Sequence, residues 1–317
     1  MDSGRNDSVD ITPSVSSEIS PAQQVPADIA DKLREIGRVI ETPRTAELYV
    51  SLHQREPYTG IKAERDIQYG VNERNRLDVF TPEDPSNPRP VLIFIHGGGF
   101  TGGDKRAPGS PFYDNVMLWA VKNGFIGVNA TYRLAPEFRW PTGPEDLASV
   151  VSWVTSNIAS YGGNPAGVYL MGTSAGAVHV ASFLSHPEFH GSGDDGLAGA
   201  ILVSGLYDLS NMPAAESLSV YFGEDTANYA ARSSLAGLLE TTTPLLIVSS
   251  ELDPPIFEQQ FDLLRNNLRD TQRGYVRAVV LPQHSHTSPV CAINTADSSL
   301  TSEILSFTAT ATYLPLA

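Results

Sequence analysis

The most informative segment places a serine between two glycines, in the order Gly172-Thr173-Ser174-Ala175-Gly176. An apolar run, Val168 to Met171, comes before it, and a stretch rich in Ala and Val follows. On a sharp turn between a strand and a helix a serine hydroxyl is exposed, and the two glycines leave room for the tight backbone. The motif is weak alone, but its position between a strand and a helix indicates that Ser174 is a nucleophile.

A second segment could supply backbone donors. His96-Gly97-Gly98-Gly99-Phe100 comes directly after the strand-like run VLIFI. Three consecutive glycines at the end of a strand let N–H groups approach a ligand closely, and such donors can stabilise an oxyanion. A flexible turn is the alternative interpretation. The segment lacks the Lys and Ser/Thr of a Walker loop and the glycine spacing of a dinucleotide site.

A candidate acid follows another strand-like run, LLIV, in the segment Ser249 to Pro255. Asp253 is the better candidate. Glu251 is nearer to the strand and could serve instead. Asp208, which follows the run AILV, is a rival that fits a loop or helix-cap residue better.

A candidate base follows the last strand-like run, YVRAVVL, in the segment Pro282 to Thr287. His284 and His286 are the only histidines this late in the chain, and spacing alone does not separate them. The chain order Ser, Asp, His fits a hydrolase triad on an α/β sheet. The other histidines are interpreted as structural, one on the helix after the serine and three on helix or loop surfaces: His179, and His53, His186 and His190.

The elements that would position these residues alternate between short apolar runs and longer helical stretches. This alternation predicts a mostly parallel sheet with helices on both faces. Two short runs, Ile67–Tyr69 and Leu77–Phe80, predict an antiparallel hairpin at a sheet edge. The strand candidates are Val91–Ile95, Phe125–Thr131, Val168–Met171, Ala200–Val203, Leu245–Val248 and Tyr275–Leu281.

The chain is expected to divide into a tail, a small cap and a catalytic domain. Residues 1–25 are rich in Ser, Asp, Pro and Gln and predict a disordered tail. Residues 26–58 predict two cap helices, the first from apolar residues at helical spacing up to Ile40 and the second around Ala46 to His53. Residues 59–317 are expected to form the catalytic domain. Within it, 207–240 is longer than a simple crossover and could add to the cap, with aromatic residues that either line a pocket or only pack: Tyr207, Tyr221, Phe222 and Tyr229.

Composition narrows the class of protein. A chain of 317 residues that is 41% hydrophobic can bury one large core. The net charge of −15 argues against a nucleic-acid partner.

We find no apolar stretch of membrane-helix length and no secretory signal pattern, so we expect a cytoplasmic protein without membrane insertion. The single cysteine, Cys291, excludes an internal disulfide and fits a small buried apolar side chain. No cofactor or metal is expected, and homo-oligomerisation is left open.

Five motifs in order, HGGGF, YRLAPE, GTSAG, SELDP and the late histidine, resemble the hormone-sensitive-lipase-like esterases and the similar formamidase-like branch of the α/β hydrolases. The resemblance runs from Tyr69 to the C-terminus. It implies the α/β-hydrolase fold, with the backbone N–H groups of Gly98, Gly99 and Ala175 as oxyanion donors. It also implies that His286 is the base.

The sequence departs from these esterases at two points. Thr131 stands just before YRLAPE, where an Asp is frequent, and Thr287-Ser288 replaces the usual small apolar pair after the histidine. Because of the second departure, the resemblance does not predict the shape of the substrate pocket. We also expect Arg133 and Glu137 of YRLAPE to form a structural network beneath the glycine loop.

The predicted chemistry is acyl transfer to Ser174 and then to water. His286 would accept the serine proton while Asp253 holds the imidazole in the productive tautomer. The sequence therefore predicts hydrolysis of a small-molecule carboxylic ester with a short or medium acyl chain. An aryl amidase or formamidase with the same triad is the alternative. A ligand-binding protein that kept the fold and lost catalysis fits less well, because every triad position is filled.

Overall fold

The computed structural model describes residues 24–84, 87–191, 195–210, 212, 215–269, 271 and 274–312. Residues 1–23 of the predicted tail therefore lie outside the described part of the chain. The described strands form one sheet in the order β1-β2-β4-β3-β5-β6-β7-β8. They are β1 Ile61–Gln68, β2 Arg76–Pro82, β3 Arg89–Ile95, β4 Ile126–Ala130, β5 Gly163–Thr173, β6 Gly199–Val203, β7 Leu245–Leu252 and β8 Val276–Ser285.

The sheet is mostly parallel, as predicted. The predicted hairpin is the antiparallel pair β1 and β2 at one edge, and β2 also pairs antiparallel with β4. All the other neighbouring strands are parallel. Each predicted strand is present, and β5 and β8 extend beyond their apolar runs.

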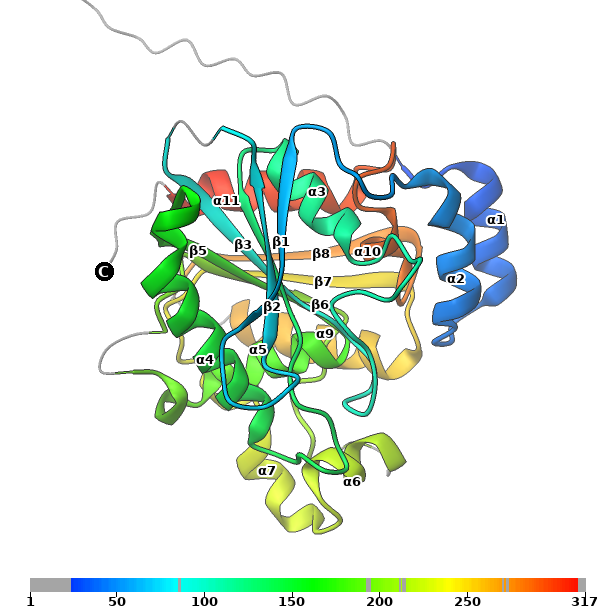
Figure 1. The fold of residues 1–317 in the computed structure, drawn as a ribbon. Coiled ribbons are helices and arrows are strands. Elements are labelled where there is room, and N and C mark those ends of the chain that lie inside the picture. The colour runs from blue at the N-terminus through cyan, green and yellow to red at the C-terminus, as the bar shows by residue number, and fades with distance from the viewer. Residues whose placement is uncertain are drawn as a thin grey trace, which may run out of the picture.

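Helices cover both faces of this sheet (Figure 1). The helices are α1 Ala27–Ile36, α2 Thr42–Tyr49, α3 Asp114–Lys122, α4 Thr142–Asn157, α5 Ala175–Ser185, α6 Glu216–Phe222, α7 Tyr229–Arg232, α8 Leu235–Leu238, α9 Pro255–Arg269, α10 Ser288–Ala292 and α11 Ser299–Thr312. In the described part of the chain there are also four short 3-10 helices: Val50–Leu52, Ile158–Tyr161, Pro187–Phe189 and Thr226–Asn228.

The two cores follow from the two-residue repeat of a strand. In β3, Ile93 packs into the core beneath α4, α5 and α9, whereas Phe94 packs into the core beneath α3 and α11. Successive side chains point to opposite faces, so a strand covered on both faces is apolar at every position. This explains the continuous apolar runs by which the sequence predicted the strands.

The N-terminal helices α1 and α2 pack against β8 and α10. Leu33 of α1 and Tyr49 of α2 share an apolar cluster with Cys291 of α10. The predicted first helix was too long, because it ends at Ile36 and the next residue, Gly37, has a φ of 80°. Ile40 therefore lies in the turn between the two helices, where it is 51% exposed. That these helices form a separate cap remains a prediction.

His53 was expected on the surface, and this was wrong. It lies just after the 3-10 helix that extends α2, it is buried, and its Nε2 is 2.8 Å from the carbonyl oxygen of Cys291. The contact joins the N-terminal helices to α10.

The segment 207–240 contains α6, α7 and α8. Its four aromatic residues are buried, and Tyr221 stacks on Phe100 of the glycine loop with ring centroids 4.7 Å apart. The sequence left two interpretations open for these aromatics, and the structure supports packing. None of the four lines the cavity that contains Ser174. The role of 207–240 as an additional cap remains a prediction.

None of the helices in the described part of the chain has both the length and the apolar character that crossing a bilayer requires.

Candidate active site

Ser174 stands at the turn between β5 and α5, and the turn is tight enough to require glycines. The serine has a φ of 54°, a left-handed conformation that costs energy in a non-glycine residue. A Cβ at Gly172 would lie 2.4 Å from the carbonyl oxygen of Gly176, and a Cβ at Gly176 would lie 2.3 Å from that of Ile95. The turn therefore projects the hydroxyl from the carboxyl end of the strand.

One predicted residue, His286, lies next to this hydroxyl, and another, Asp253, lies next to His286. His286, just after β8, has its Nε2 2.9 Å from Ser174 Oγ. Its Nδ1 is 2.7 Å from Oδ1 of Asp253, which follows β7. Asp253 and His286 are at most 1% exposed, whereas Ser174 is partly exposed. The structure thus brings the three residues together, with the serine accessible from outside.

The second carboxylate oxygen of Asp253 is held by three donors. The Ser204 hydroxyl at 2.8 Å, the Ser249 hydroxyl at 3.0 Å and the Ser250 N–H at 2.8 Å all donate to Oδ2. This leaves Oδ1 for the histidine and fixes the orientation of the carboxylate. The sequence analysis missed Ser204, although it directly follows β6 at the same edge of the sheet.

His284 is not part of this constellation. Its Nδ1 lies 2.8 Å from Ser288 Oγ and its Nε2 lies 3.2 Å from Asp297 Oδ2. Burial alone would raise the pKa of Asp297, but the His284 imidazole and the hydrogen bonds from Ser299 hold that pKa below its ordinary value. The structure therefore places His286, and not His284, next to the serine.

The rival acids also lie elsewhere. Glu251 is exposed and accepts a hydrogen bond from the N–H of Gln283 at 2.7 Å. Asp208 lies in a loop, where its Oδ1 accepts from the N–H of Ser210 at 2.9 Å. Of these three carboxylates, only that of Asp253 contacts His286.

The glycine loop lies against the nucleophile. A Cβ at Gly97 would be 3.1 Å from the Cβ of Ser174. Gly98 and Gly99 have φ values of 131° and 59°, and a Cβ at Gly98 would lie 2.1 Å from the carbonyl oxygen of Gly102. Ala175 is the first residue of α5, where an N–H has no partner within the helix.

Ser174, His286, Gly98, Gly99 and Ala175 line one cavity of about 540 Å³. Its wall comes from widely separated segments: Ile40 of the α1–α2 turn, Thr42 of α2, Tyr113 just before α3, Val178 of α5, Leu206, Met212, Ala215, Ser217 and Leu218 in or just before the 207–240 segment, Ile256 and Phe257 of α9, and Thr287 and Val290. Among the described residues that line it, none is Asp, Glu, Lys or Arg. The cavity thus offers apolar surface and a few hydroxyl groups.

Two buried histidines lie behind the glycine loop. His96 stacks on Tyr132 with ring centroids 4.4 Å apart, and burial lowers its pKa to about 4. His179 of α5 packs edge-on against Tyr132, and burial lowers its pKa to about 3. Both imidazoles are therefore neutral near pH 7, and neither lines the cavity.

The predicted network of Arg133 and Glu137 is only half present. Arg133 pairs with Asp146 at 2.9 Å and with Glu145 at 3.1 Å, both in α4. Glu137 is exposed, so the prediction was wrong for this residue, because the chain turns it outward. Thr131, at the departure before YRLAPE, is buried and donates its hydroxyl to the carbonyl oxygen of Arg74.

The chain is similar to a known family and to known esterases. Residues 77–268 match the family model described as BD-FAE. The chain belongs to the BD-FAE family. It is 30% identical over 278 residues to esterase LipQ of Mycobacterium tuberculosis, a match that covers 81% of this chain. It is also 35% identical over 126 residues to para-nitrobenzyl esterase of Bacillus subtilis, covering 36% of this chain and 25% of that protein.

Solved structures show the same fold for this BD-FAE member. Esterase B of Lactobacillus rhamnosis superposes with a TM-score of 0.71 at 18% identity, covering 90% of this chain and 95% of the other. The expected α/β-hydrolase fold and the resemblance to its esterases are confirmed. The chain spans 65% of the length of LipQ and smaller shares of other curated relatives.

Proposed function

We propose that this chain hydrolyses carboxylic esters through an acyl-enzyme, with Ser174 as nucleophile, His286 as base and Asp253 as the acid. The observation that carries the proposal is the unbroken line of contacts from Ser174 Oγ to His286 and on to Asp253, at 2.9 and 2.7 Å. A neutral imidazole within hydrogen-bond reach of a serine hydroxyl can accept its proton as the oxygen attacks an acyl carbon. Asp253 holds the ring by Nδ1, which leaves Nε2 unprotonated for that task.

The backbone N–H groups of Gly98, Gly99 and Ala175 are the proposed oxyanion donors. All three residues line the cavity beside the serine. Donors fixed in a backbone need no reorganisation when charge develops on the carbonyl oxygen, and removing one such donor costs about 10² to 10³ in turnover. His286, once protonated, can return its proton to the leaving alcohol, and water then repeats the sequence on the acyl-enzyme.

The proposed substrate is a small, uncharged ester with a short or medium acyl chain. A cavity of about 540 Å³ falls in the range of sites that hold a small organic molecule. Its lining supports apolar substituents, since burying an unpaired charge there would be costly. An aryl amidase or formamidase would use the same triad, so an ester and the matching anilide should be assayed together.

The direct test is hydrolysis of p-nitrophenyl butyrate by four proteins: wild type, Ser174→Ala, His286→Ala and His284→Ala. We expect Ser174→Ala and His286→Ala to lose about 10³-fold or more of kcat. His284→Ala should retain a much larger share, because its ring contacts Ser288 and Asp297. Near-wild-type turnover by His286→Ala would exclude the assignment. Preference for the anilide over the ester would favour the amidase.

A further inference from the structure

The segment that follows the glycine loop folds back beneath it. The N–H of Gly102 donates to the carbonyl oxygen of Gly98 at 3.0 Å. A Cβ at Gly103 would lie 2.2 Å from the carbonyl oxygen of Gly97. Gly102 and Gly103 are therefore packed backbone to backbone against the proposed oxyanion donors. Any displacement of Gly103 must displace Gly97 and Gly98 as well.

Arg74 holds this segment from outside. It lies in the turn between β1 and β2, and its Nη2 donates to the carbonyl oxygen of Gly103 at 2.9 Å. Its Nε donates to the carbonyl oxygen of Tyr132 at 2.8 Å, and Nη1 lies 3.4 Å from a carboxylate oxygen of Asp104. A guanidinium is planar with its donors in a fixed arrangement. One side chain thus sets the spacing between the glycine loop and the chain after β4.

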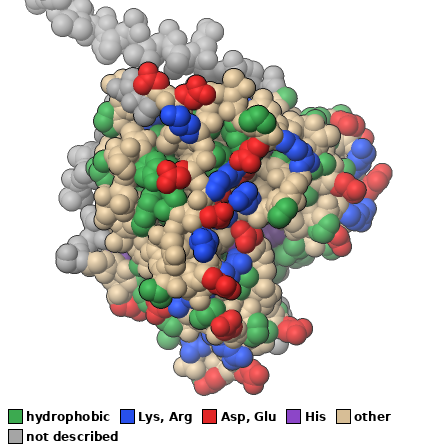
Figure 2. All heavy atoms as spheres, viewed as in Figure 1, with side chains coloured by type: hydrophobic (Ala, Val, Ile, Leu, Met, Phe, Trp, Pro, Cys, Tyr) green, Lys and Arg blue, Asp and Glu red, His purple; other side chains and the backbone are tan. Residues whose placement is uncertain are grey.

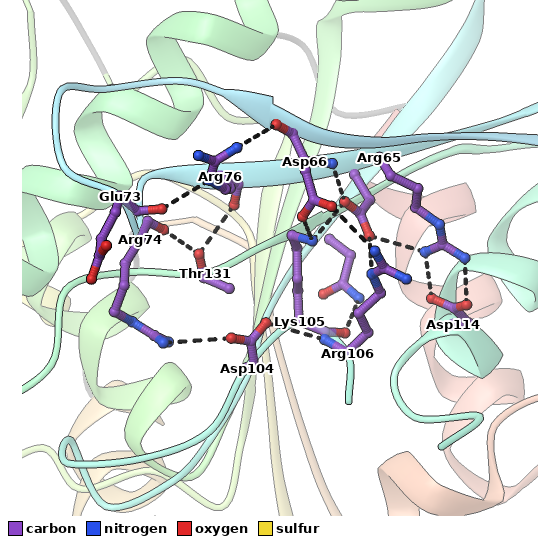
Figure 3. A network of polar contacts seen from close by, with 12 residues as sticks. Arg65, Asp66, Glu73, Arg74, Arg76, Asp104, Lys105, Arg106, Asp114 and Thr131 are labelled. Carbon is purple, nitrogen blue, oxygen red and sulfur yellow. Dashed lines mark hydrogen bonds and ion pairs between the residues drawn. The ribbon is translucent and has the colours of Figure 1, made fainter. Parts of the chain in front are cut away.

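Lys105 anchors the same segment two residues later. Its side chain is only 3% exposed, and its Nζ lies 2.6 Å from Asp66 and 2.8 Å from Asp78. Its own carbonyl oxygen accepts from Nδ2 of Asn129 at 2.6 Å. Figure 3 shows Lys105 reaching toward β1 while Arg74 reaches Asp104 from the other side. Strands β1, β2 and β4 therefore all contact the chain beyond Gly103.

The surrounding charges are satisfied by one another. Asp78 is fully buried and also pairs with Arg65 at 2.9 Å, and Arg65 in turn pairs with Asp114. Hydrogen bonding to Lys105 lowers the pKa of Asp66. Acidic and basic side chains are interspersed over the face that includes β1 and β2 (Figure 2). Removing one partner of a buried pair is strongly destabilising, so such a network has little freedom to shift.

Gly103 lines one cavity, whereas the two residues that follow it, Asp104 and Lys105, line another. The cavity that Gly103 lines is the 540 Å³ cavity that contains Ser174. Arg74 and Lys105 line a separate cavity of about 270 Å³ on the outer side. Neither side chain lines the main cavity, so any influence on the reaction must pass through the backbone of the loop.

We infer that Arg74 and Lys105 are positioning residues, which act through Gly103 to hold the N–H groups of Gly98 and Gly99 where the oxyanion forms. The inference rests on the proposed function. We call the contacts of Arg74 and Lys105 with residues 103–105 the clamp. Loss of the clamp would leave the substrate cavity intact, but it would misplace N–H donors that matter only when charge develops on the carbonyl oxygen. Such a change lowers kcat with little change in KM.

The test compares Arg74→Gln with Arg76→Gln on p-nitrophenyl butyrate. Arg76 is the matched control, because it lies two residues away and lines the same outer cavity, but its guanidinium donates to the carbonyl oxygens of Glu73 and Asp66. We expect Arg74→Gln to lower kcat by about ten- to a hundredfold, a smaller decrease than removal of a whole oxyanion donor would cause. KM should stay within about twofold of the wild-type value. Arg76→Gln should stay within about twofold of wild type in both constants.

Two further measurements separate positioning from loss of folding. Arg74→Lys restores a cation that can reach one carbonyl but not both, so it should recover part of the lost kcat. The rate at which a fluorophosphonate labels Ser174 should fall in parallel with kcat, since the phosphoryl oxygen occupies the same donors. Lys105→Met leaves Asp78 with one fewer partner and could unfold, so Arg74 carries the test.

Equal kcat values for Arg74→Gln and Arg76→Gln would overturn the inference. So would a loss in Arg74→Gln that matches its unfolded fraction in a thermal melt. If instead Ser174→Ala hydrolyses the ester as wild type does, the proposed function itself fails. If the serine is required and the two arginine variants behave alike, only the clamp is wrong.

Discussion

Arg38 donates a hydrogen bond from Nε to the backbone carbonyl oxygen of Asp253 over 2.8 Å. Arg38 lies in the turn between α1 and α2, and its Nη2 also pairs with Glu258 of α9 at 2.6 Å. Ile40 of the same turn and Thr42, the first residue of α2, line the cavity. The N-terminal helices are thus attached directly to the loop that carries the proposed acid.

Arg38→Ala should release this turn and lower kcat/KM on p-nitrophenyl butyrate by about three- to tenfold, as expected for a hydrogen bond worth about 1 kcal/mol. The free energy of unfolding should fall by about 1 kcal/mol from the lost hydrogen bond, with little added by the half-exposed ion pair with Glu258. Arg34→Ala is the control, since Arg34 pairs with Asp31 on the exposed surface of α1. Equal activities of the two variants would show that the turn does not influence the site.

The uncharged lining of the main cavity predicts discrimination against charged acyl groups. We expect kcat/KM for a p-nitrophenyl ester of monomethyl succinate to exceed that for the free hemisuccinate by about 10² or more, because a buried carboxylate would have no partner. The net charge of −15 also repels the anion, so the comparison is repeated at high salt, which screens that effect. Similar values for the two esters at high salt would contradict the uncharged cavity.

His179 predicts part of the acid sensitivity of the fold. Burial lowers its pKa from an ordinary 6.5 to about 3, so below pH 6.5 the unfolded chain binds a proton that the folded chain does not. Stability is then greatest above that pH and falls by up to about 1.4 kcal/mol per pH unit on acidification toward pH 3.

The variant His179→Leu tests this directly. Neither ring nitrogen of His179 has a hydrogen-bond partner within the described residues, so an apolar side chain should keep or raise the free energy of unfolding at pH 7. Between pH 6.5 and pH 5 the variant should lose about 1.7 kcal/mol less than wild type in urea titrations. The acid sensitivity due to His96 would remain. Parallel pH profiles for the two proteins would rule out the explanation.

Cys291 should be inert in the folded protein. It is 3% exposed beneath α1 and α2, and burial raises its pKa to about 12, so the reactive thiolate is scarce. We expect no reaction with Ellman's reagent at pH 8 in buffer and a single equivalent in guanidinium chloride. Rapid reaction in buffer would mean that α1 and α2 do not cover the Cys291 thiol in solution.

The sequence predicted the elements whose signal is local. Runs such as Val91 to Ile95 are apolar at every position because both faces of the strand are buried, and the glycines around Ser174 are required by contacts within a few residues. Ile40 was misplaced because its apolar character continued the helical spacing beyond Gly37, where the chain turns. Arg38, Arg74 and Ser204 were missed because their partners lie far away in the sequence.

The most direct test of the account is the site at which a fluorophosphonate probe attaches. Peptide mass spectrometry after labelling should find one adduct, on Ser174, formed rapidly in wild type and far more slowly in His286→Ala than in His284→Ala. An intact, folded protein that stays unlabelled, or an adduct on any other residue, would contradict the claim that these three side chains make Ser174 a nucleophile.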